Sequence, residues 1–165
     1  MSPRTTAIAA ALSVLALGSP LIVANAKPLA DKIYNSGVVK YEQGNYQGAI
    51  ADFTKAIEIN PKFAYAFSNR GAAKNELKDY QGAISDYDKA IEINPEDAYP
   101  YYNRALSKLR LSDHLGALAD INRSFEIDPD DADVISLRGI SKEYLGDTKG
   151  ACADWKEASS LGDED

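Results

Sequence analysis

The sequence predicts an all-α protein in which eight helices form four stacked hairpins. The segment Tyr46–Ile50 (YQGAI) recurs unchanged as residues 80–84. In the same way, Lys55–Pro61 (KAIEINP) recurs as residues 89–95, shifted along the chain by the same interval. A fixed period of about 34 residues is typical of stacked helical units. No segment alternates polar and apolar residues with the period of two that indicates a strand, so no strands are expected.

The period divides the chain into four units. Pro129 continues the spacing set by the two repeated segments, and the next step falls on Asp163, close to the end of the sequence. Each unit is expected to hold two helices joined by a turn. The units are residues 30–63, 64–97, 98–131 and 132–165.

Small and large side chains alternate at helical spacing within each unit. The small position of the first helix holds Gly37, Gly71, Ala105 and Gly139 in the four units. The two small positions of the second helix hold Ala49, Ala83, Ala117 and Ala151, and then Ala56, Ala90, Ser124 and Ala158. Between them stand the large residues Phe53, Tyr87, Ile121 and Trp155. This alternation lets the two helices approach closely and interdigitate.

The turns are also marked in the sequence. Each unit has an Asx residue at the break between its helices, where the side chain can cap the amides of the helix that follows. These residues are Asn45, Asp79, Asp113 and Asp147. Pro61, Pro95 and Pro129 close the second helices, because proline lacks the amide hydrogen that a longer helix would need.

The order of glycine, alanine, aromatic, alanine and proline within one period resembles the tetratricopeptide repeat. The first three units match it closely, and the fourth departs from it, with Asp163 in place of proline. Such irregularity suits a terminal unit that has no neighbour. The resemblance implies an α-solenoid, a short right-handed superhelix of helix-turn-helix hairpins in which the first helices line a concave face.

Residues 1–26 are expected to be a secretory signal peptide. A short polar start precedes the uncharged run Ala7–Leu17, and Ala24–Ala26 supplies the small residues that a signal peptidase needs. Cleavage before Lys27 leaves residues 27–165 as an exported domain, in the periplasm or a comparable lumen. The alternative is that the apolar stretch stays attached and anchors the protein to a membrane facing that compartment.

Composition argues against several classes of partner. The chain has 25 acidic and 18 basic side chains, a formal net charge of −7. Nucleic acid is therefore not expected as a partner, because phosphate backbones are bound by clustered lysines and arginines. Cys152 is the single cysteine, so no intramolecular disulfide can form and the domain must be held together by packing.

The sequence shows no catalytic constellation, and the protein is not expected to be an enzyme. His114 takes a place where two other units have tyrosine, which indicates a packing or surface residue. Cys152 aligns with Ile50, Ile84 and Leu118, so it is expected to be a small buried apolar side chain. No motif indicates a metal, a cofactor or a small-molecule substrate.

Acidic and basic residues recur at fixed places in the units. Asp52, Asp86, Asp120 and Asp154 share one position, and Arg70, Arg104 and Arg138 share another. They are interpreted as ion pairs across a helix–helix contact that fix how the units stack. The alternative is a ladder of charges that binds a ligand.

A row of asparagines marks a candidate binding surface. Asn35, Asn69 and Asn103 share one first-helix position. In the resembling family this helix lines the concave face, where such amides hydrogen-bond the backbone of an extended peptide. Helical spacing predicts that the same face carries Tyr34, Val38, Tyr41, Tyr65, Tyr99, Tyr102 and Leu106. The alternative is that these asparagines and tyrosines satisfy one another between neighbouring helices.

The family's carboxylate clamp, which grips the acidic C-terminus of a chaperone, is not expected here. It needs lysines and an arginine at set groove positions. This chain has Tyr34, Val38, Tyr99 and Asn103 at four of them, and only Asn69 matches.

The expected function is that of a non-catalytic scaffold. A curved groove without a reactive group can bind an extended peptide or a partner protein, and the exported location suggests assembly or maintenance of an envelope or membrane complex. Two alternatives remain: a membrane-tethered adaptor with an uncleaved anchor, and a structural module that associates with itself through its last unit.

Overall fold

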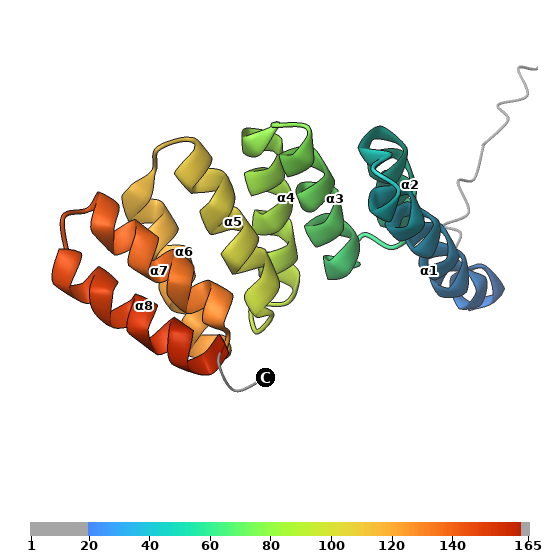
Figure 1. Cartoon of the computed structure of the whole chain (residues 1–165). Helices are drawn as coiled ribbons and strands as arrows, with labels where there is room; N and C mark the ends of the chain where they lie inside the picture. The colour runs from blue at the N-terminus through green and yellow to red at the C-terminus, as the bar shows by residue number, and fades with distance from the viewer. Residues whose placement is uncertain (1–19, 163–165) are drawn as a thin grey trace, which may run out of the picture.

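The computed structural model describes residues 20–162, with side chains from residue 27 onward. It confirms the all-α prediction, with eight helices packed as four hairpins (Figure 1). The helices are α1 (Pro20–Glu42), α2 (Tyr46–Ile59), α3 (Ala64–Glu76), α4 (Tyr80–Ile93), α5 (Ala98–Arg110), α6 (His114–Ile127), α7 (Ala132–Tyr144) and α8 (Thr148–Gly162).

The hairpins follow one another in chain order along a curved array (Figure 1). Each helix packs on the helix before it and the helix after it. In addition, the first helices of neighbouring hairpins touch one another, α1 with α3 and α3 with α5. The surface formed by the first helices α1, α3, α5 and α7 is called the inner face below.

Within each hairpin, a small residue of the first helix lies against a large side chain of the second. A Cβ atom placed on Gly37 would stand 2.7 Å from the Phe53 ring, and one on Gly71 would stand 2.8 Å from the Tyr87 ring. Both distances are shorter than van der Waals contact. The helices therefore approach so closely that these positions leave no room for a side chain.

Capping side chains fix where the second helices begin, as the sequence predicts. The oxygen of Asn45 accepts a hydrogen bond from the amide of Gly48 at 3.0 Å. The corresponding bonds in the other hairpins run from Gly82 to Asp79, Gly116 to Asp113 and Gly150 to Asp147, at 2.9 to 3.0 Å. Helices α2, α4 and α6 end two residues before their prolines. Each hairpin thus has a defined start and stop for its second helix.

The residue before each cap has the left-handed backbone conformation that reverses the chain. Gly44 has a φ of 75° and Gly146 a φ of 85°, whereas Lys78 and Ser112 take φ values of 63° and 64° at the same place in the other two hairpins. Glycine adopts this conformation at little cost, and the other residues do so with some strain.

Helix α1 differs from the expected first helix because it begins at Pro20, before the predicted start of the first unit at residue 30. It continues across the predicted cleavage point before Lys27. Residues 1–19 of the predicted leader lie outside the described residues. No helix between residues 20 and 162 combines the length and the apolar composition needed to span a membrane.

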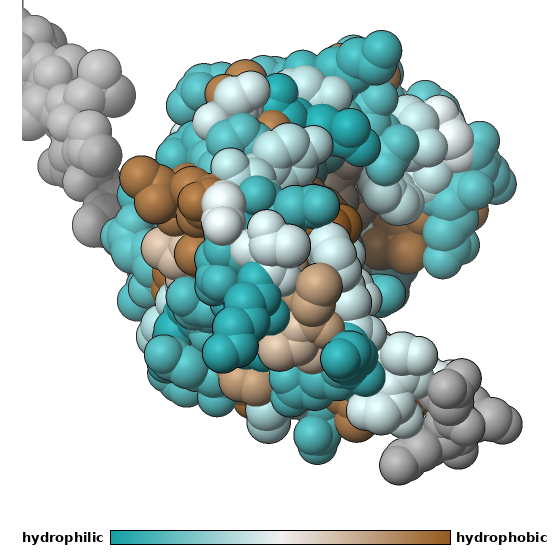
Figure 2. All heavy atoms as spheres, turned by 60° about the vertical axis from the view of Figure 1, so that its left-hand side comes forward, coloured by the Kyte–Doolittle hydropathy of each residue, from teal (hydrophilic) through white to brown (hydrophobic). Residues whose placement is uncertain are grey.

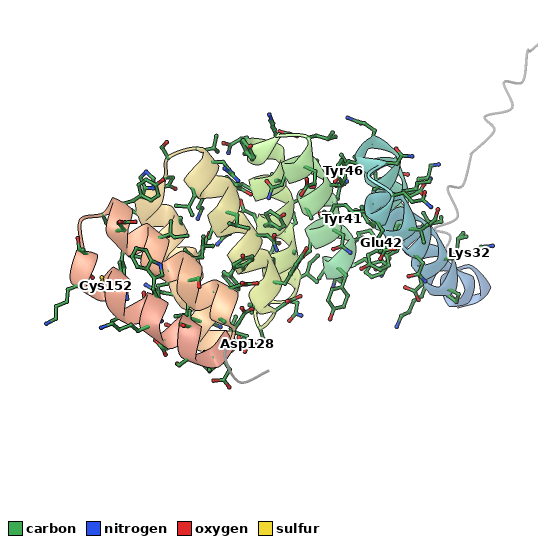
Figure 3. The ribbon with its side chains drawn as sticks, in the orientation of Figure 1. Lys32, Tyr41, Glu42, Tyr46, Asp128 and Cys152 are labelled. Carbon is green, nitrogen blue, oxygen red and sulfur yellow. The ribbon has the colours of Figure 1, made fainter. Side chains whose placement is uncertain are left out.

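The prediction for Cys152 was wrong, because its side chain is exposed on α8 (Figure 3). Its counterpart Ile50 is half-buried and packs against a core cluster that includes Ala73 of the following hairpin. No hairpin follows α8 in the described part of the chain, so the same position faces outward there. His114 is half-buried and stacks on Tyr144 with ring centroids 4.5 Å apart, which agrees with a packing residue.

The close approach inside the hairpin predicts the outcome of adding one methyl group. Alanine is favoured over glycine in a helix by about 1 kcal/mol, but overpacking a core costs ~1–3 kcal/mol. The cost exceeds the gain, so Gly71→Ala should lower the free energy of unfolding by about 1 kcal/mol. The third hairpin pairs alanine with isoleucine at these positions. In urea unfolding, the double variant Gly71→Ala/Tyr87→Ile should therefore be less destabilised than the sum of its single changes.

Gly162→Ala is the matched control, because a Cβ on Gly162 meets nothing within 4 Å. It should change the free energy of unfolding little. If Gly71→Ala proved as stable as the unmodified protein, the described contact with Tyr87 would be contradicted.

Candidate functional site: the inner face of the stack

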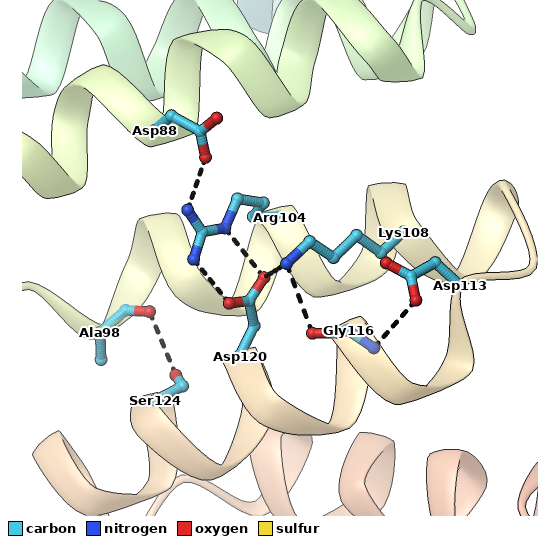
Figure 4. A network of polar contacts seen from close by, with 8 residues as sticks. All are labelled: Asp88, Ala98, Arg104, Lys108, Asp113, Gly116, Asp120 and Ser124. Atoms are coloured by element: carbon cyan, nitrogen blue, oxygen red, sulfur yellow. Dashed lines mark hydrogen bonds and ion pairs between the residues drawn. The ribbon is translucent and has the colours of Figure 1, made fainter.

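The recurring aspartates and arginines form ion pairs inside the hairpins. Asp120 of α6 receives two hydrogen bonds from Arg104 of α5, at 2.6 and 2.9 Å (Figure 4). Arg70 pairs with Asp86 and Arg138 with Asp154 in the neighbouring hairpins. Each arginine also reaches the preceding hairpin: Arg70 donates to Thr54, Arg104 to Asp88, and Arg138 lies over the Phe125 ring. One guanidinium thus joins the two helices of its own hairpin and the hairpin before it.

A set of lysines that the sequence analysis overlooked completes the pairs. Lys40, Lys74, Lys108 and Lys142 recur once in each unit and contact Asp52, Asp86, Asp120 and Asp154, respectively, at 2.5 to 2.8 Å. In the first hairpin Ser36 stands where the others have arginine, and it donates to Asp52 at 2.7 Å. Every one of the four aspartates therefore has partners on the first helix of its own hairpin.

These contacts favour the ionised form of Asp52 and Asp154. Burial by itself raises the pKa of Asp154, but hydrogen bonds from Arg138 and Lys142 outweigh it and hold the pKa below its usual value. In the same way, Lys40 and Ser36 overcome the effect of burial on the pKa of Asp52. All four carboxylates are buried, so the repeated charges tie the hairpins together and do not face a ligand.

The predicted tyrosines of the inner face fall into two groups. Tyr34, Val38 and Tyr41 pack against the core of the first hairpin, and the Tyr34 and Phe63 rings lie 4.9 Å apart. Tyr102 and Leu106 pack in the same way against the core of the third hairpin. By contrast, Tyr65 and Tyr99 are 58% and 46% exposed. The side chains that pack against the cores help to hold the fold together, whereas Tyr65 and Tyr99 expose aromatic surface that a ligand can contact.

The three predicted asparagines have different surroundings. Asn35 is exposed on α1. The Asn69 amide donates to the Tyr34 hydroxyl at 2.6 Å, which joins α3 to α1. The Asn103 amide donates to the backbone carbonyl of Tyr99 in its own helix at 3.0 Å. Asn69 thus behaves as the alternative interpretation expects, whereas the side chain of Asn35 and the side-chain oxygen of Asn103 remain candidates for contacting a ligand.

A first cavity of about 490 Å³ lies where α3, α5 and α7 begin and α6 ends. Three of the predicted tyrosines contribute to its wall, together with four carboxylates that the sequence analysis did not single out. Its lining consists of Tyr65, Asn94, Glu96, Asp97, Ala98, Tyr99, Tyr102, Ser124, Ile127, Asp128 and Asp131. Asp97 and Asp131 lie one repeat period apart, just before α5 and α7, and this spacing was visible in the sequence.

A second cavity of about 310 Å³ lies where α3 and α5 end. It brings together Tyr41, Asn103 and Leu106 of the predicted set with the charged residues Glu76, Lys78 and Arg110. Its remaining lining residues are Ala72, Asn75, Tyr80 and Ser107. The two cavities thus lie at opposite ends of the same pair of first helices and differ in charge.

The hydroxyls of Tyr41 and Tyr102 on the inner face stay protonated at neutral pH. Burial raises the pKa of Tyr41 to about 12, and the charge of Glu76 adds to the effect. Burial also raises the pKa of Tyr102, with Asp133 and Asp131 nearby. Neutral phenols can donate and accept hydrogen bonds, so these side chains suit recognition of polar groups.

On the face drawn in Figure 2, hydrophobicity alone does not locate a binding surface. The face drawn in Figure 2 is mostly hydrophilic, with hydrophobic residues in separate small areas. Large continuous apolar patches are the usual marker of an interface. Among residues 20–162, no three His, Cys, Asp or Glu side chains converge closely enough to hold a metal ion. The inner face with its two cavities is therefore the candidate site.

Comparison with family models agrees with this fold. Residues 37–77 match a model described as a TPR repeat, and residues 64–97 and 86–119 match two models described as tetratricopeptide repeats. Together these matches run from residue 37 to residue 119, just over half of the chain. A search of curated proteins found no significant match.

Solved structures of other proteins share the architecture. A crystal structure of MamA has a TM-score of 0.78 at 21% identity and covers 88% of this chain and 84% of its own. MamA from Desulfovibrio magneticus RS-1 has a TM-score of 0.75 at 21% identity and covers 81% and 75%. The first TPR domain of Spaghetti (RPAP3), bound to the HSP90 peptide SRMEEVD, has a TM-score of 0.72 at 24% identity and covers 73% and 95%.

The stacked hairpins and the cavities of the inner face define a repeat scaffold of the α-solenoid class. Such scaffolds present one continuous surface built from equivalent positions of successive repeats. The chain belongs to the tetratricopeptide repeat family. Domains of this family generally bind proteins or peptides and are typically non-catalytic.

The ion pairs predict a large difference between two arginine variants. Arg104→Ala should lower the free energy of unfolding by about 2 to 3 kcal/mol, because it removes one partner of a buried pair and the link to Asp88. Arg123→Ala removes only exposed pairs with Glu96 and Glu126, and it should change the free energy of unfolding little. Urea unfolding of both variants is the measurement, and equal losses would contradict the structural role of the buried pairs.

Proposed function

We propose that this protein is a non-catalytic scaffold that binds an extended peptide or a segment of a partner protein across its inner face. The observation that carries the proposal is the pair of cavities at the two ends of α3 and α5, lined by tyrosines of the first helices. Tyrosine offers a large contact area with few rotatable bonds and a polar tip, and it is enriched in recognition surfaces.

The size of the site favours a segment of chain over a compact small molecule. The cavities are open depressions on one face, so a ligand that fills both must extend along the first helices between them. An extended segment loses conformational freedom when it binds. Affinity for an isolated peptide is therefore expected near the micromolar range, about −8 kcal/mol.

The predicted asparagines take separate roles in this proposal. Asn35 and Asn103 meet the backbone of the ligand, because an amide can both donate and accept. Asn69 holds the Tyr34 hydroxyl at 2.6 Å and so positions the aromatic surface. Replacing Asn69 would therefore weaken binding because Tyr34 would no longer be held in position, not because a contact with the ligand would be lost.

A variant pair tests the inner face directly. Affinity capture from the native compartment with the full chain should recover a partner, and Tyr65→Ala/Tyr99→Ala/Asn103→Ala should lose most of it, because the variant removes both exposed rings and one amide. Leu115→Ala/Tyr144→Ala is the control, since these side chains are 71% and 66% exposed but line neither cavity. Both variants should keep the helical circular dichroism of the parent.

Retention of the partner by the inner-face variant, together with its loss from the control, would move the binding site to the edge near Leu115 and Tyr144. Equal retention by both variants would likewise contradict the proposed groove.

We further propose that the domain is exported and that residues 1–26 are removed, which would place it in a periplasm or a comparable lumen. Small residues at Ala24 and Ala26 support this proposal. Assembly or maintenance of an envelope or membrane complex is the corresponding biological role. The alternative is a membrane-tethered adaptor with the same binding face.

Mass spectrometry of the protein from its own cells tests the export proposal. The expected N-terminus is Lys27, with the protein in the soluble extracytoplasmic fraction. An intact leader together with recovery in the membrane fraction would instead support the tethered adaptor.

A further inference from the structure

The first cavity is lined by acidic side chains, and this negative charge indicates which kind of ligand side chain it binds. Its wall combines the rings of Tyr65, Tyr99 and Tyr102 with four carboxylates, and none of its lining residues is a lysine or an arginine. From these features, and building on the proposed function, we infer that the bound segment is basic and that one of its lysine or arginine side chains enters this cavity.

The carboxylates keep most of their negative charge available. Glu96 is paired with Arg123 at 2.9 Å, outside the cavity. Asp97 and Asp131 accept hydrogen bonds from backbone amides at the starts of α5 and α7, which orient the carboxylates without neutralising them. Asp128 is exposed beyond the end of α6 (Figure 3). Three negative charges therefore surround the tyrosine rings.

The geometry suits a cationic side chain better than a metal ion. No three acidic groups in the described part of the chain come close enough together to coordinate a metal. A lysine or arginine instead brings a long aliphatic stem, which packs on aromatic rings, and a charged head that remains hydrated near the rim. Cations are also attracted to the faces of tyrosine rings. The cavity offers both features, with Tyr65 and Tyr99 as exposed surfaces and the carboxylates around them.

The same charges disfavour an acidic ligand. The RPAP3 domain of similar fold is bound to the peptide SRMEEVD, which carries three acidic residues. In this chain, the first cavity would place such residues beside Asp97, Asp128 and Asp131. Like charges in contact across an interface are strongly unfavourable. The partner of this protein is therefore expected to differ in charge from that peptide.

The test uses four random-sequence peptide libraries that differ only at a fixed central residue: lysine, arginine, leucine or glutamate. Fluorescence anisotropy with the full chain at low salt should show at least about tenfold tighter binding of the lysine and arginine libraries than of the glutamate library. The preference should shrink as salt is raised, because exposed charges are screened.

The variant Asp97→Asn/Asp128→Asn/Asp131→Asn should lose this preference. Asparagine caps helices about as well as aspartate, and Asn60 and Asn94 occupy the position of Asp128 in the first two hairpins. The matched control, Asp79→Asn/Asp113→Asn/Asp147→Asn, removes the same number of charges from caps in the turns within the hairpins. It should keep the preference of the parent.

The outcomes separate this inference from the proposed function. If the parent binds all four libraries equally and the Tyr65→Ala/Tyr99→Ala/Asn103→Ala variant loses all of them, the inner face binds peptides but the basic preference is wrong. A preference that survives in the Asp97→Asn/Asp128→Asn/Asp131→Asn variant also overturns the inference. If the parent binds none of the libraries, both the inference and the peptide-binding proposal fail.

Discussion

The closeness of the two helices in each hairpin is the constraint on which the rest of the structure depends. Gly37 and Gly71 lie so near the rings of Phe53 and Tyr87 that a methyl group would overlap with them. In the second hairpin, this spacing lets Arg70 and Lys74 of one helix reach Asp86 of the next at hydrogen-bonding distance. The same arginine also donates to Thr54 of the preceding hairpin. Packing inside the hairpin thus brings the charged side chains within reach of one another, and the arginines of these ion pairs join neighbouring hairpins.

In this framework, the residues that stabilise the fold are different from the residues that are proposed to bind the ligand. The aspartates at the centre of the ion pairs are buried and repeat in every unit, whereas Tyr65, Tyr99 and the carboxylates of the first cavity stand at the surface. Surface side chains on a rigid scaffold can vary without loss of the fold. Proteins with about one fifth identical residues share this architecture, so the identity of the partner has to be argued from the inner face itself.

The fold could be predicted from the sequence because its main determinants are local and repeat. Caps such as Asp79 and Asp113, and small residues such as Gly71, recur from unit to unit and act within one hairpin. Features that depend on neighbouring hairpins were harder to predict. The exposure of Cys152 follows from the absence of a described hairpin beyond α8, whereas an alignment of units treats that position as equivalent to the half-buried Ile50.

The candidate site was predictable only in part. The sequence placed the tyrosines on the first helices, but it could not show that Asn69 is engaged by Tyr34 of the preceding hairpin. It also did not reveal that Asp97, Asp128 and Asp131 line one cavity with those tyrosines, since Asp97 comes from a different turn than the other two and only stacking brings the turns together. The lysine partners of the aspartates recur visibly at Lys40 and Lys74, and the same repeat argument would have found them.

Amide hydrogen exchange of the full chain, with and without a captured partner or a bound basic peptide, tests the central claim most directly. If the inner face is the binding surface, added protection should concentrate in α3 and α5, where the two cavities lie. The buried framework of α4 and α6 should change less, because its packing does not depend on the ligand. Protection confined to α8 around Cys152, with α3 and α5 unchanged, would show that the protein binds through the end of the stack and would contradict the account.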